Sequence, residues 1–445
     1  MIMPNPILPL WEYIPDAEPR VFGSRLYLYG SHDRAACDKF CDFRLKVWYA
    51  ELDDLNNFKC SGVSFSTVDK PDRPSDTKEW TQSELFAPDV IEKDGKYYLY
   101  AYIVGSKGCV GVSDKPEGPF KLLSRYKYDE ADAGDDGIYN DAGVLVDDDG
   151  RVYIYYGFTE SNMNEINGDN MYEIIKGSHK RPVIPDSDDV PEEQRFFEAS
   201  SPRKIGGRYY LIYSPKKGSR LAYAISDSPT GPFEYKGYIV DNSQDYPGGN
   251  DHGSLMQVNG QWYIFYHRMT NNTIMSRRAC VEPVTILPDG TIPPVEMTSL
   301  GFEKSLDPYK PTPAEIACVL KGGCFITELD IFTRPIVNIL KGSVIGYKYF
   351  DFGDDYSSSE YTLALKVRGQ GCYSRVDVVI DDYENGEVIG SVDVGLSDGV
   401  YKGKVKALTG RHAIYLKPTF EVEEWTAQWF DGKQLFELLE FTFMK

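Results

Sequence analysis

The chain has 445 residues, a length that exceeds one ordinary hydrophobic core and predicts two domains. Its formal net charge of −20 argues against nucleic acid as a partner, because phosphates would be repelled, and suits an enzyme for neutral or cationic ligands. The 33 tyrosines lie in alternating stretches with frequent turn dipeptides, and helical periodicity is scarce. An all-β protein is therefore expected.

The eight cysteines are scattered and form no CxxC pair, so neither a zinc site nor a disulfide framework is predicted. Residues 1–10 lack the basic start and apolar core of a signal peptide, and no later run is apolar enough to span a bilayer. A cytoplasmic enzyme without a membrane partner is expected, or a secreted or periplasmic one if a leader has been removed.

One motif recurs five times within residues 1–299: a short strand, a glycine turn and an aromatic strand. The aromatic strands align on a tyrosine in each copy: Tyr27, Tyr98, Tyr153, Tyr210 and Tyr263. Successive copies are 53 to 71 residues apart, which is close to the length of one four-stranded blade. The repeat predicts a five-bladed β-propeller.

A polar residue precedes each aligned tyrosine by nine to twelve positions: Asp16, Asp89, Asp141, Glu198 and His252. In a propeller the innermost strands line the central channel, so equivalent offsets predict equivalent positions around the axis. Several carboxylates facing one another suit glycoside hydrolysis, which needs a protonated acid and an ionised base. Crowded like charges raise at least one pKa, so that one carboxyl stays protonated near neutrality.

Within this ring each residue has an expected role. Glu198 is the candidate general acid, because its longer side chain reaches the leaving oxygen, and Asp16 is the candidate base. Asp141 is expected to control the pKa and the orientation of the acid. Four further residues are expected to bind the substrate: the ring members Asp89 and His252, the nearby Phe86 as a stacking platform, and Arg268 at the end of the fifth aromatic strand.

Five stretches together resemble glycoside hydrolase family 43: NPILPL…IPDAEPRVF, LFAPDVIEKDGKYYLYA, NDAGVLVDDDGRVYIYYG, FFEASSPRKIGGRYYLIYS and GNDHGSL…WYIFYHR. The resemblance covers residues 5–293 and implies an inverting mechanism, with Asp16 as base, Asp141 as pKa modulator and Glu198 as acid. It also implies that His252 lies near either an axial calcium ion, of which it is then the candidate ligand, or a cluster of water molecules, while the chemistry needs no cofactor. Carboxyl groups of Asp16 and Glu198 about 6.5–9.5 Å apart would leave room for the attacking water.

The rest of the chain differs in character. Residues 300–323 are rich in proline and predict a linker, and residues 324–445 predict a β-sandwich of jelly-roll type from alternating strands with Asp/Gly turns. This part resembles a carbohydrate-binding module of family 6. Such modules bind sugars through exposed aromatic pairs. Tyr347 and Tyr349 fit either that role or a position in the core.

The expected function is inverting, exo-acting removal of terminal α-L-arabinofuranosyl or β-D-xylosyl groups from plant polysaccharides or oligosaccharides, so the expected partner is a carbohydrate. A β-galactofuranosidase and an endo-acting arabinanase or xylanase are alternatives on the same scaffold. A non-catalytic, carbohydrate-binding propeller is the alternative of another class, disfavoured because all three carboxylates are present. A fructan-cleaving enzyme is disfavoured as well, because Asn-Asp-Pro-Asn-Gly is absent from the first blade.

Overall fold

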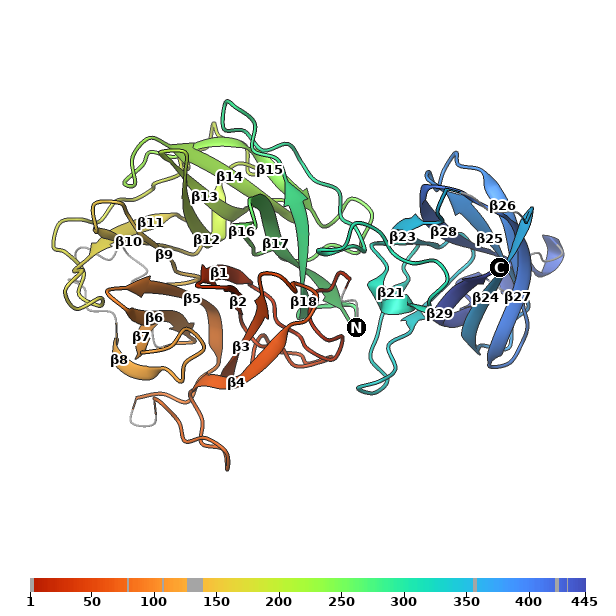
Figure 1. Cartoon of the computed structure of the whole chain (residues 1–445), viewed down its shortest axis with the longest axis horizontal. Helices are drawn as coiled ribbons and strands as arrows, with labels where there is room; N and C mark the ends of the chain where they lie inside the picture. Colours follow the sequence, from red (N-terminus) through yellow and green to blue (C-terminus); the bar gives the residue numbers. More distant parts are fainter. Residues whose placement is uncertain are drawn as a thin grey trace.

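The structure is a computed structural model that describes residues 4–77, 80–105, 108–125, 139–354, 358–420, 424–429 and 431–445. Over these residues the named elements are strands and two short 3₁₀ helices. Figure 1 shows two bodies side by side, with the propeller formed by the first part of the chain and a smaller β domain by the last. No helix in this described part has the length and apolarity needed to cross a membrane.

Each of the five blades is an antiparallel sheet whose strands follow chain order. Blade one contains β1 (Glu18–Phe22), β2 (Arg25–Tyr29), β3 (Arg44–Glu51) and β4 (Lys59–Ser66). Blade two contains β5 (Leu85–Lys93), β6 (Lys96–Ile103), β7 (Gly108–Ser113) and β8 (Lys121–Arg125). Blade three contains β9 (Gly143–Val146), β10 (Val152–Tyr156) and β11 (Asn162–Ile166).

The remaining two blades complete the propeller. Blade four contains β12 (Phe196–Ile205), β13 (Arg208–Pro215), β14 (Arg220–Ser226) and β15 (Glu234–Asp241). Blade five contains β16 (Ser254–Val258), β17 (Gln261–Thr270) and β18 (Thr273–Val284). The first strands of the five blades contact one another in a closed ring, in the order β1, β5, β9, β12, β16 and back to β1. The predicted five-bladed propeller is confirmed.

The N-terminal segment closes the ring along the outer strand of blade five. The backbone N–H of Ile7 donates to the carbonyl of Ala279 at 3.0 Å, and the side chain of Asn5 bonds both backbone groups of Val281 at 2.8 Å. This segment satisfies β18, which would otherwise present unpaired backbone groups to water. It also leads directly into the loop that carries Asp16.

The C-terminal domain is one rolled sheet that closes into a sandwich. Its elements are β19 (Thr312–Pro313), η2 (Ala314–Ile316), β20 (Val319–Lys321), β21 (Phe325–Ile326), β22 (Ile336–Val337), β23 (Val344–Asp351), β24 (Glu360–Gly369), β25 (Ser374–Ile380), β26 (Val388–Val394), β27 (Gly399–Lys406), β28 (Arg411–Thr419), η3 (Glu424–Trp429) and β29 (Phe436–Met444). The strand order is β20-β23-β28-β25-β26-β27-β24-β29-β22-β21, with β19 beside β29. The predicted β-sandwich is confirmed.

The two domains share one hydrophobic core. Buried side chains of blades four and five, among them Tyr223 and Tyr266, belong to the same cluster as Ile316 and Leu320. The predicted linker 300–323 therefore includes ordered parts of the second domain, namely β19, η2 and β20. Tyr347 packs edge-on against Phe441 with no exposed surface, so it is a core residue.

Candidate active site

Four of the five inner strands begin with a sharp turn of the backbone. A non-glycine residue with positive φ lies just before the strand or within its first four residues: Asp16 (56°), Ala87 (35°), Asp141 (48°) and Ala199 (69°). This left-handed conformation costs L-residues about 1–2 kcal/mol and persists where the surrounding structure enforces it, often at functional sites. The repeated turn places Asp16 and Asp141 at the end of the channel, and Glu198 lies beside it at a bulge of β12.

Asp16 is almost fully buried and tightly held. Ser31 Oγ donates to Asp16 Oδ2 at 2.6 Å, and Arg277 Nη1 donates to Asp16 Oδ1 at 2.9 Å. Burial alone would raise the pKa of Asp16, but the charge of Arg277, assisted by the hydrogen bond from Ser31, outweighs it and lowers the pKa below its ordinary value. Asp16 is therefore ionised at neutral pH, as a general base must be.

Arg277 links this base to a second buried carboxylate. Its Nε and Nη2 donate to Asp33 at 2.9 and 3.0 Å, while its Nη1 serves Asp16. This fork geometry is the strong, oriented form of an arginine–carboxylate pair. The guanidinium group is thereby fixed in position, and with it the direction of the Asp16 carboxylate.

Two histidines flank the base. His252 Nδ1 lies 3.8 Å from Asp16 Oδ1 and 3.9 Å from Asp141 Oδ2, so it connects the base with the predicted modulator. His267 Nδ1 accepts the backbone N–H of Asp16 at 3.3 Å, and its Nε2 lies 3.0 Å from the carbonyl of Asn250. Burial, with Arg277 nearby, lowers the pKa of His267 to about 3, so this ring stays neutral and acts as an orienting group.

Asp141 and Glu198 have raised pKa values for a shared reason. Burial raises the pKa of Asp141 to about 7, assisted by the negative charge of Glu198. Burial also raises the pKa of Glu198 to about 7, with the charge of Asp16 as the next cause. The two carboxyls titrate together, so one proton is retained between them near neutrality. A protonated carboxyl beside an ionised one is the requirement for acid–base hydrolysis of a glycoside.

Glu198 is the most accessible of the three carboxylates. Asp16 and Asp141 are buried, whereas Glu198 is only partly so. Within the described residues no protein donor hydrogen-bonds its carboxyl group. Its proton is therefore available to a ligand in the channel.

Phe86 lies beside this site. Its ring is 6.4 Å from that of Phe40, and the Arg277 guanidinium lies 5.0 Å from the Phe40 ring. Phe86 is only partly buried and belongs to the aromatic wall next to the base. Its role as a stacking platform for a sugar stays a prediction.

The expectation that Asp89 binds substrate is wrong. Asp89 has no exposed surface; Arg20 donates to both of its carboxylate oxygens at 2.7 Å, and the backbone N–H of Val144 donates at 2.8 Å. Asp89 therefore ties blades one, two and three together. Its offset of nine residues matches Glu18, which lies equally deep and accepts a 2.6 Å bond from Arg203. Ala87 takes the place in blade two that Asp16 takes in blade one.

The expectation for Arg268 is wrong as well. Its side chain is 2% exposed and donates to the Tyr266 hydroxyl, to Glu282 and to the carbonyl of Thr298. Side chains alternate along a strand, so Arg268 points away from the face on which His267 meets Asp16. Arg268 belongs to the packing between blade five and the segment that leads to the second domain.

Four residues of the site were not predicted: Ser31, Asp33, His267 and Arg277. Strand alternation in Phe265-Tyr266-His267-Arg268 carries a signal for His267, since only every second residue faces the axis. Predicting Arg277 would require the pairing register of β17 with β18. In that register Arg277 lies opposite Met269, on the same face of the sheet as His267. No pattern within one strand supplies that register.

The residues around His252 do not form a calcium cage by themselves. Calcium takes about six to eight oxygen ligands, and His252 offers nitrogen. Throughout the described ranges no group of three or more His, Cys, Asp or Glu is arranged to hold a metal ion.

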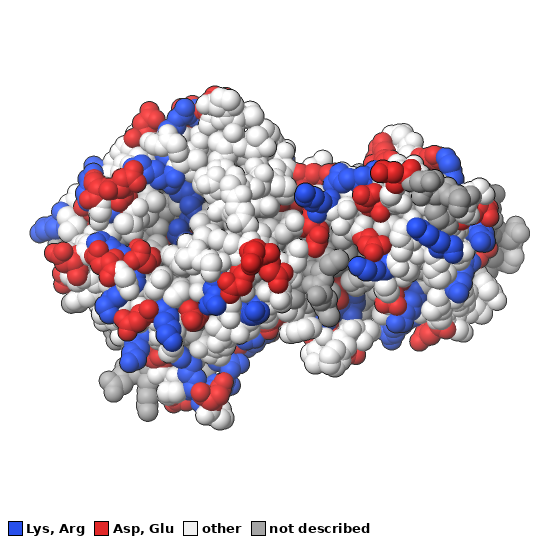
Figure 2. Space-filling view, in the orientation of Figure 1, with Lys and Arg blue, Asp and Glu red and all other residues white. Residues whose placement is uncertain are grey.

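Charge on the face of the molecule drawn in Figure 2 does not single out another site. Figure 2 shows acidic and basic side chains interspersed over the visible face of both domains. The negative excess of the chain is not gathered into one patch on that face.

A five-bladed propeller with an ionised aspartate and a proton-sharing carboxyl pair at one end of its channel defines a glycoside hydrolase. The comparison with known families agrees: the chain belongs to glycosyl hydrolases family 43, whose model matches residues 3–292. The predicted family is confirmed. The three predicted catalytic carboxylates lie within the matched range.

The similarity to known proteins extends along most of the chain. The chain is 35% identical to a xylosidase/arabinosidase from Thermoclostridium stercorarium, and the alignment covers 92% of this chain and 95% of the relative. A β-xylosidase/α-arabinofuranosidase from a compost metagenome has been solved in complex with xylotriose, in calcium-free form. It is 27% identical to this chain with a TM-score of 0.52, and the match covers 66% of this chain and 97% of that one. A Bacillus subtilis arabinoxylan arabinofuranohydrolase, solved with cellotetraose, covers 99% of this chain and 97% of its own at 20% identity and a TM-score of 0.54, which shows a shared fold. The resemblance of the tail to a family 6 module stays a prediction.

Proposed function

We propose that the protein is an inverting, exo-acting glycosidase that removes terminal α-L-arabinofuranosyl or β-D-xylosyl groups. The observation that carries this proposal is the pairing of an ionised Asp16, held by Arg277, with the proton-retaining pair of Asp141 and Glu198. The full-length similarity to a xylosidase/arabinosidase supports the choice of sugar.

The mechanism follows from the protonation states. Asp16 accepts a proton from a water molecule as its oxygen attacks the anomeric carbon. Glu198 donates its proton to the glycosidic oxygen as that bond breaks, so the leaving group departs as a neutral alcohol. Asp141 keeps the pKa of Glu198 high, because a nearby negative charge disfavours a second one. Attack from the face opposite the leaving group inverts the anomeric carbon.

The test is a panel of nitrophenyl glycosides carrying α-L-arabinofuranose, β-D-xylose or β-D-galactofuranose, with Glu198→Ala as control. Turnover of either pentoside by the wild type but not by the variant is expected. ¹H NMR of the first-formed sugar is expected to show the inverted anomer, and a retained anomer would overturn the mechanism. Preferred turnover of the galactofuranoside, or cleavage only inside polymers, would favour the alternative activities.

A calcium ion on the axis beside His252 remains a hypothesis. Water would have to supply most of its ligands, because the described residues supply no oxygen cage there. The measurement is the melting temperature after dialysis against EGTA, with and without added calcium. A calcium-dependent rise that His252→Ala abolishes supports the ion; equal melting temperatures reject it.

A further inference from the structure

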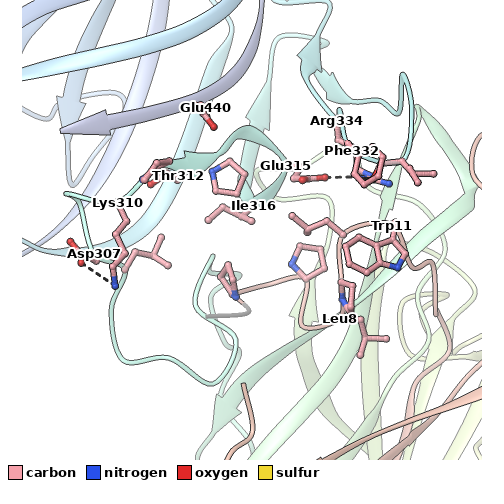
Figure 3. Close-up of a pocket in the computed structure, with 18 of the residues that line it drawn as sticks. Leu8, Trp11, Asp307, Lys310, Thr312, Glu315, Ile316, Phe332, Arg334 and Glu440 are labelled. Carbon is pink, nitrogen blue, oxygen red and sulfur yellow. Dashed lines mark hydrogen bonds and ion pairs between the residues drawn. The ribbon is translucent and has the colours of Figure 1, made fainter. Parts of the chain in front are cut away.

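A large groove lies between the two domains, away from the catalytic carboxylates. It has a volume of about 820 Å³; one wall is the N-terminal segment from Pro4 to Trp11, and the other consists of residues 305–316 and the loop between β21 and β22. Figure 3 shows Trp11 and Phe332 among its lining side chains, contributed by different domains. Trp11 is 54% exposed and Phe332 is 84% exposed, which is unusual for such large apolar groups.

The groove carries no unbalanced charge. Each charged side chain that lines it has a partner: Asp307 with Lys310 at 3.5 Å, Arg334 with Glu328 at 3.2 Å, Glu315 with Arg278 at 3.3 Å, and Glu440 with Lys366 at 3.4 Å. An ionic ligand would have to break one of these pairs. The combination of exposed aromatic rings with compensated polar groups suits a neutral ligand that has apolar faces and hydroxyl edges, as a pyranose chain has.

The wall of the groove formed by the loop between β21 and β22 is tied to segments that lead to active-site residues. The loop between β21 and β22 is anchored through Glu328, whose carboxylate accepts a bond from the Tyr13 hydroxyl and whose N–H donates to Asn271 at 2.8 Å. Asn271 lies in the turn that leads into β18, a few residues before Arg277, and is therefore at the active-site end of blade five. Trp11 precedes Asp16 by five residues, which limits their Cα separation to about 18 Å.

We propose that this groove binds the neutral main chain of the substrate polysaccharide, with Trp11 and Phe332 stacking on its sugar rings. The inference rests on the proposed glycosidase function and adds a binding site outside the channel. A chain seated in the groove presents its terminal or branching sugar to Asp16 and Glu198, and the second domain thereby contributes to substrate choice. A second copy of the protein fits less well, because a concave surface is not complementary to itself as a symmetric dimer requires.

The test compares Trp11→Ala and Phe332→Ala with the wild type in two assays. The first is affinity electrophoresis in soluble neutral arabinoxylan. The second is the ratio of kcat/KM on that polymer to kcat/KM on the best nitrophenyl glycoside. Each variant is expected to weaken retention and to lower the ratio about tenfold, which corresponds to the loss of one stacking contact. Tyr373→Ala is the matched control, since Tyr373 is 68% exposed on the C-terminal domain and does not line the groove.

The outcomes separate this inference from the proposed function. Wild-type retention and an unchanged ratio in both groove variants overturn the inference, as does an equal loss in Tyr373→Ala. Absent turnover of every glycoside, combined with retention that depends on Trp11 and Phe332, refutes the proposed function and leaves the binding site standing. A change from dimer to monomer in Phe332→Ala by light scattering would assign the groove to a second copy and overturn the inference. Melting temperatures check that each variant is folded. If Trp11→Ala is unstable, the result for Phe332→Ala alone decides whether the groove binds the polysaccharide.

Discussion

Arg277 Nη1 lies 2.9 Å from Oδ1 of Asp16, so the predicted base carries a buried cation as its permanent neighbour. The same guanidinium group holds Asp33, and its side chain is therefore not free to leave Asp16. This contact explains how a buried aspartate keeps a pKa below its ordinary value despite the cost of burial.

Replacing Arg277 with glutamine is expected to raise the pKa of Asp16, because the neutral amide no longer favours the ionised form. The loss of an adjacent opposite charge shifts a carboxyl pKa by about 1–3 units. The acid limb of the kcat/KM–pH profile should therefore move to higher pH. Arg277→Lys keeps the charge and should move the limb less. An acid limb that is the same in the wild type and Arg277→Gln would show that Asp16 is not the titrating base.

Removing the acid with Glu198→Ala is expected to reduce kcat/KM in proportion to the need for a proton on the leaving group. General acid catalysis contributes about 10²–10⁴-fold, so the loss on a natural oligosaccharide should lie in that range. A dinitrophenyl glycoside has a leaving group that departs without a proton and should lose far less. Equal losses on both substrates would instead point to a collapsed site, which a melting curve can verify.

The basic limb of the pH profile should reflect the pair of Asp141 and Glu198. Both pKa values are raised to about 7, and the active form is the one in which Glu198 holds a proton. Activity is therefore expected to fall as pH rises through about 7. Asp141→Asn removes a negative charge near Glu198, lowers the pKa of Glu198 and should shift this limb to lower pH. A shift to higher pH would contradict the assigned roles.

The clustering of Asp16, Asp141 and His252 could be predicted from the sequence because the repeat transmits geometry. Equivalent offsets from the aligned tyrosines place equivalent residues at the same end of the channel, and His252 lies 3.8 Å from Asp16 and 3.9 Å from Asp141. The offset of Asp89 is the shortest of the five, and the structure shows that this difference places Asp89 in the interior. A shift of two residues along an inner strand moves a side chain by about 7 Å, which is enough to take it from the end of the channel into the interior of the propeller.

The parts that could not be predicted depend on contacts between distant segments. Arg277 reaches Asp16 across 261 positions of the chain, and Tyr13 reaches Glu328 across 315. The groove between the domains arises from such contacts, since neither wall is remarkable in sequence alone. The fold class needs only local pattern and repeat length, whereas a site assembled from several blades also needs their register.

The corrected role of Asp89 yields a stability prediction. Asp89→Ala should leave Arg20 buried without its partner, and breaking a buried ion pair in this way costs about 3–5 kcal/mol. Urea unfolding should therefore show a clearly lower midpoint. The double variant Arg20→Met/Asp89→Leu removes both charges and should recover much of the loss, because no uncompensated charge remains in the interior.

Asp149→Ala is the matched control for this experiment. Asp149 also pairs with an arginine, Arg151, at 2.8 Å, but both side chains are about half exposed, so water replaces the lost partner. Its unfolding midpoint should stay near that of the wild type. If Asp89→Ala unfolds at the wild-type midpoint and loses sugar binding instead, Asp89 contacts substrate after all and the interior role derived from its bonds to Arg20 and Val144 is wrong.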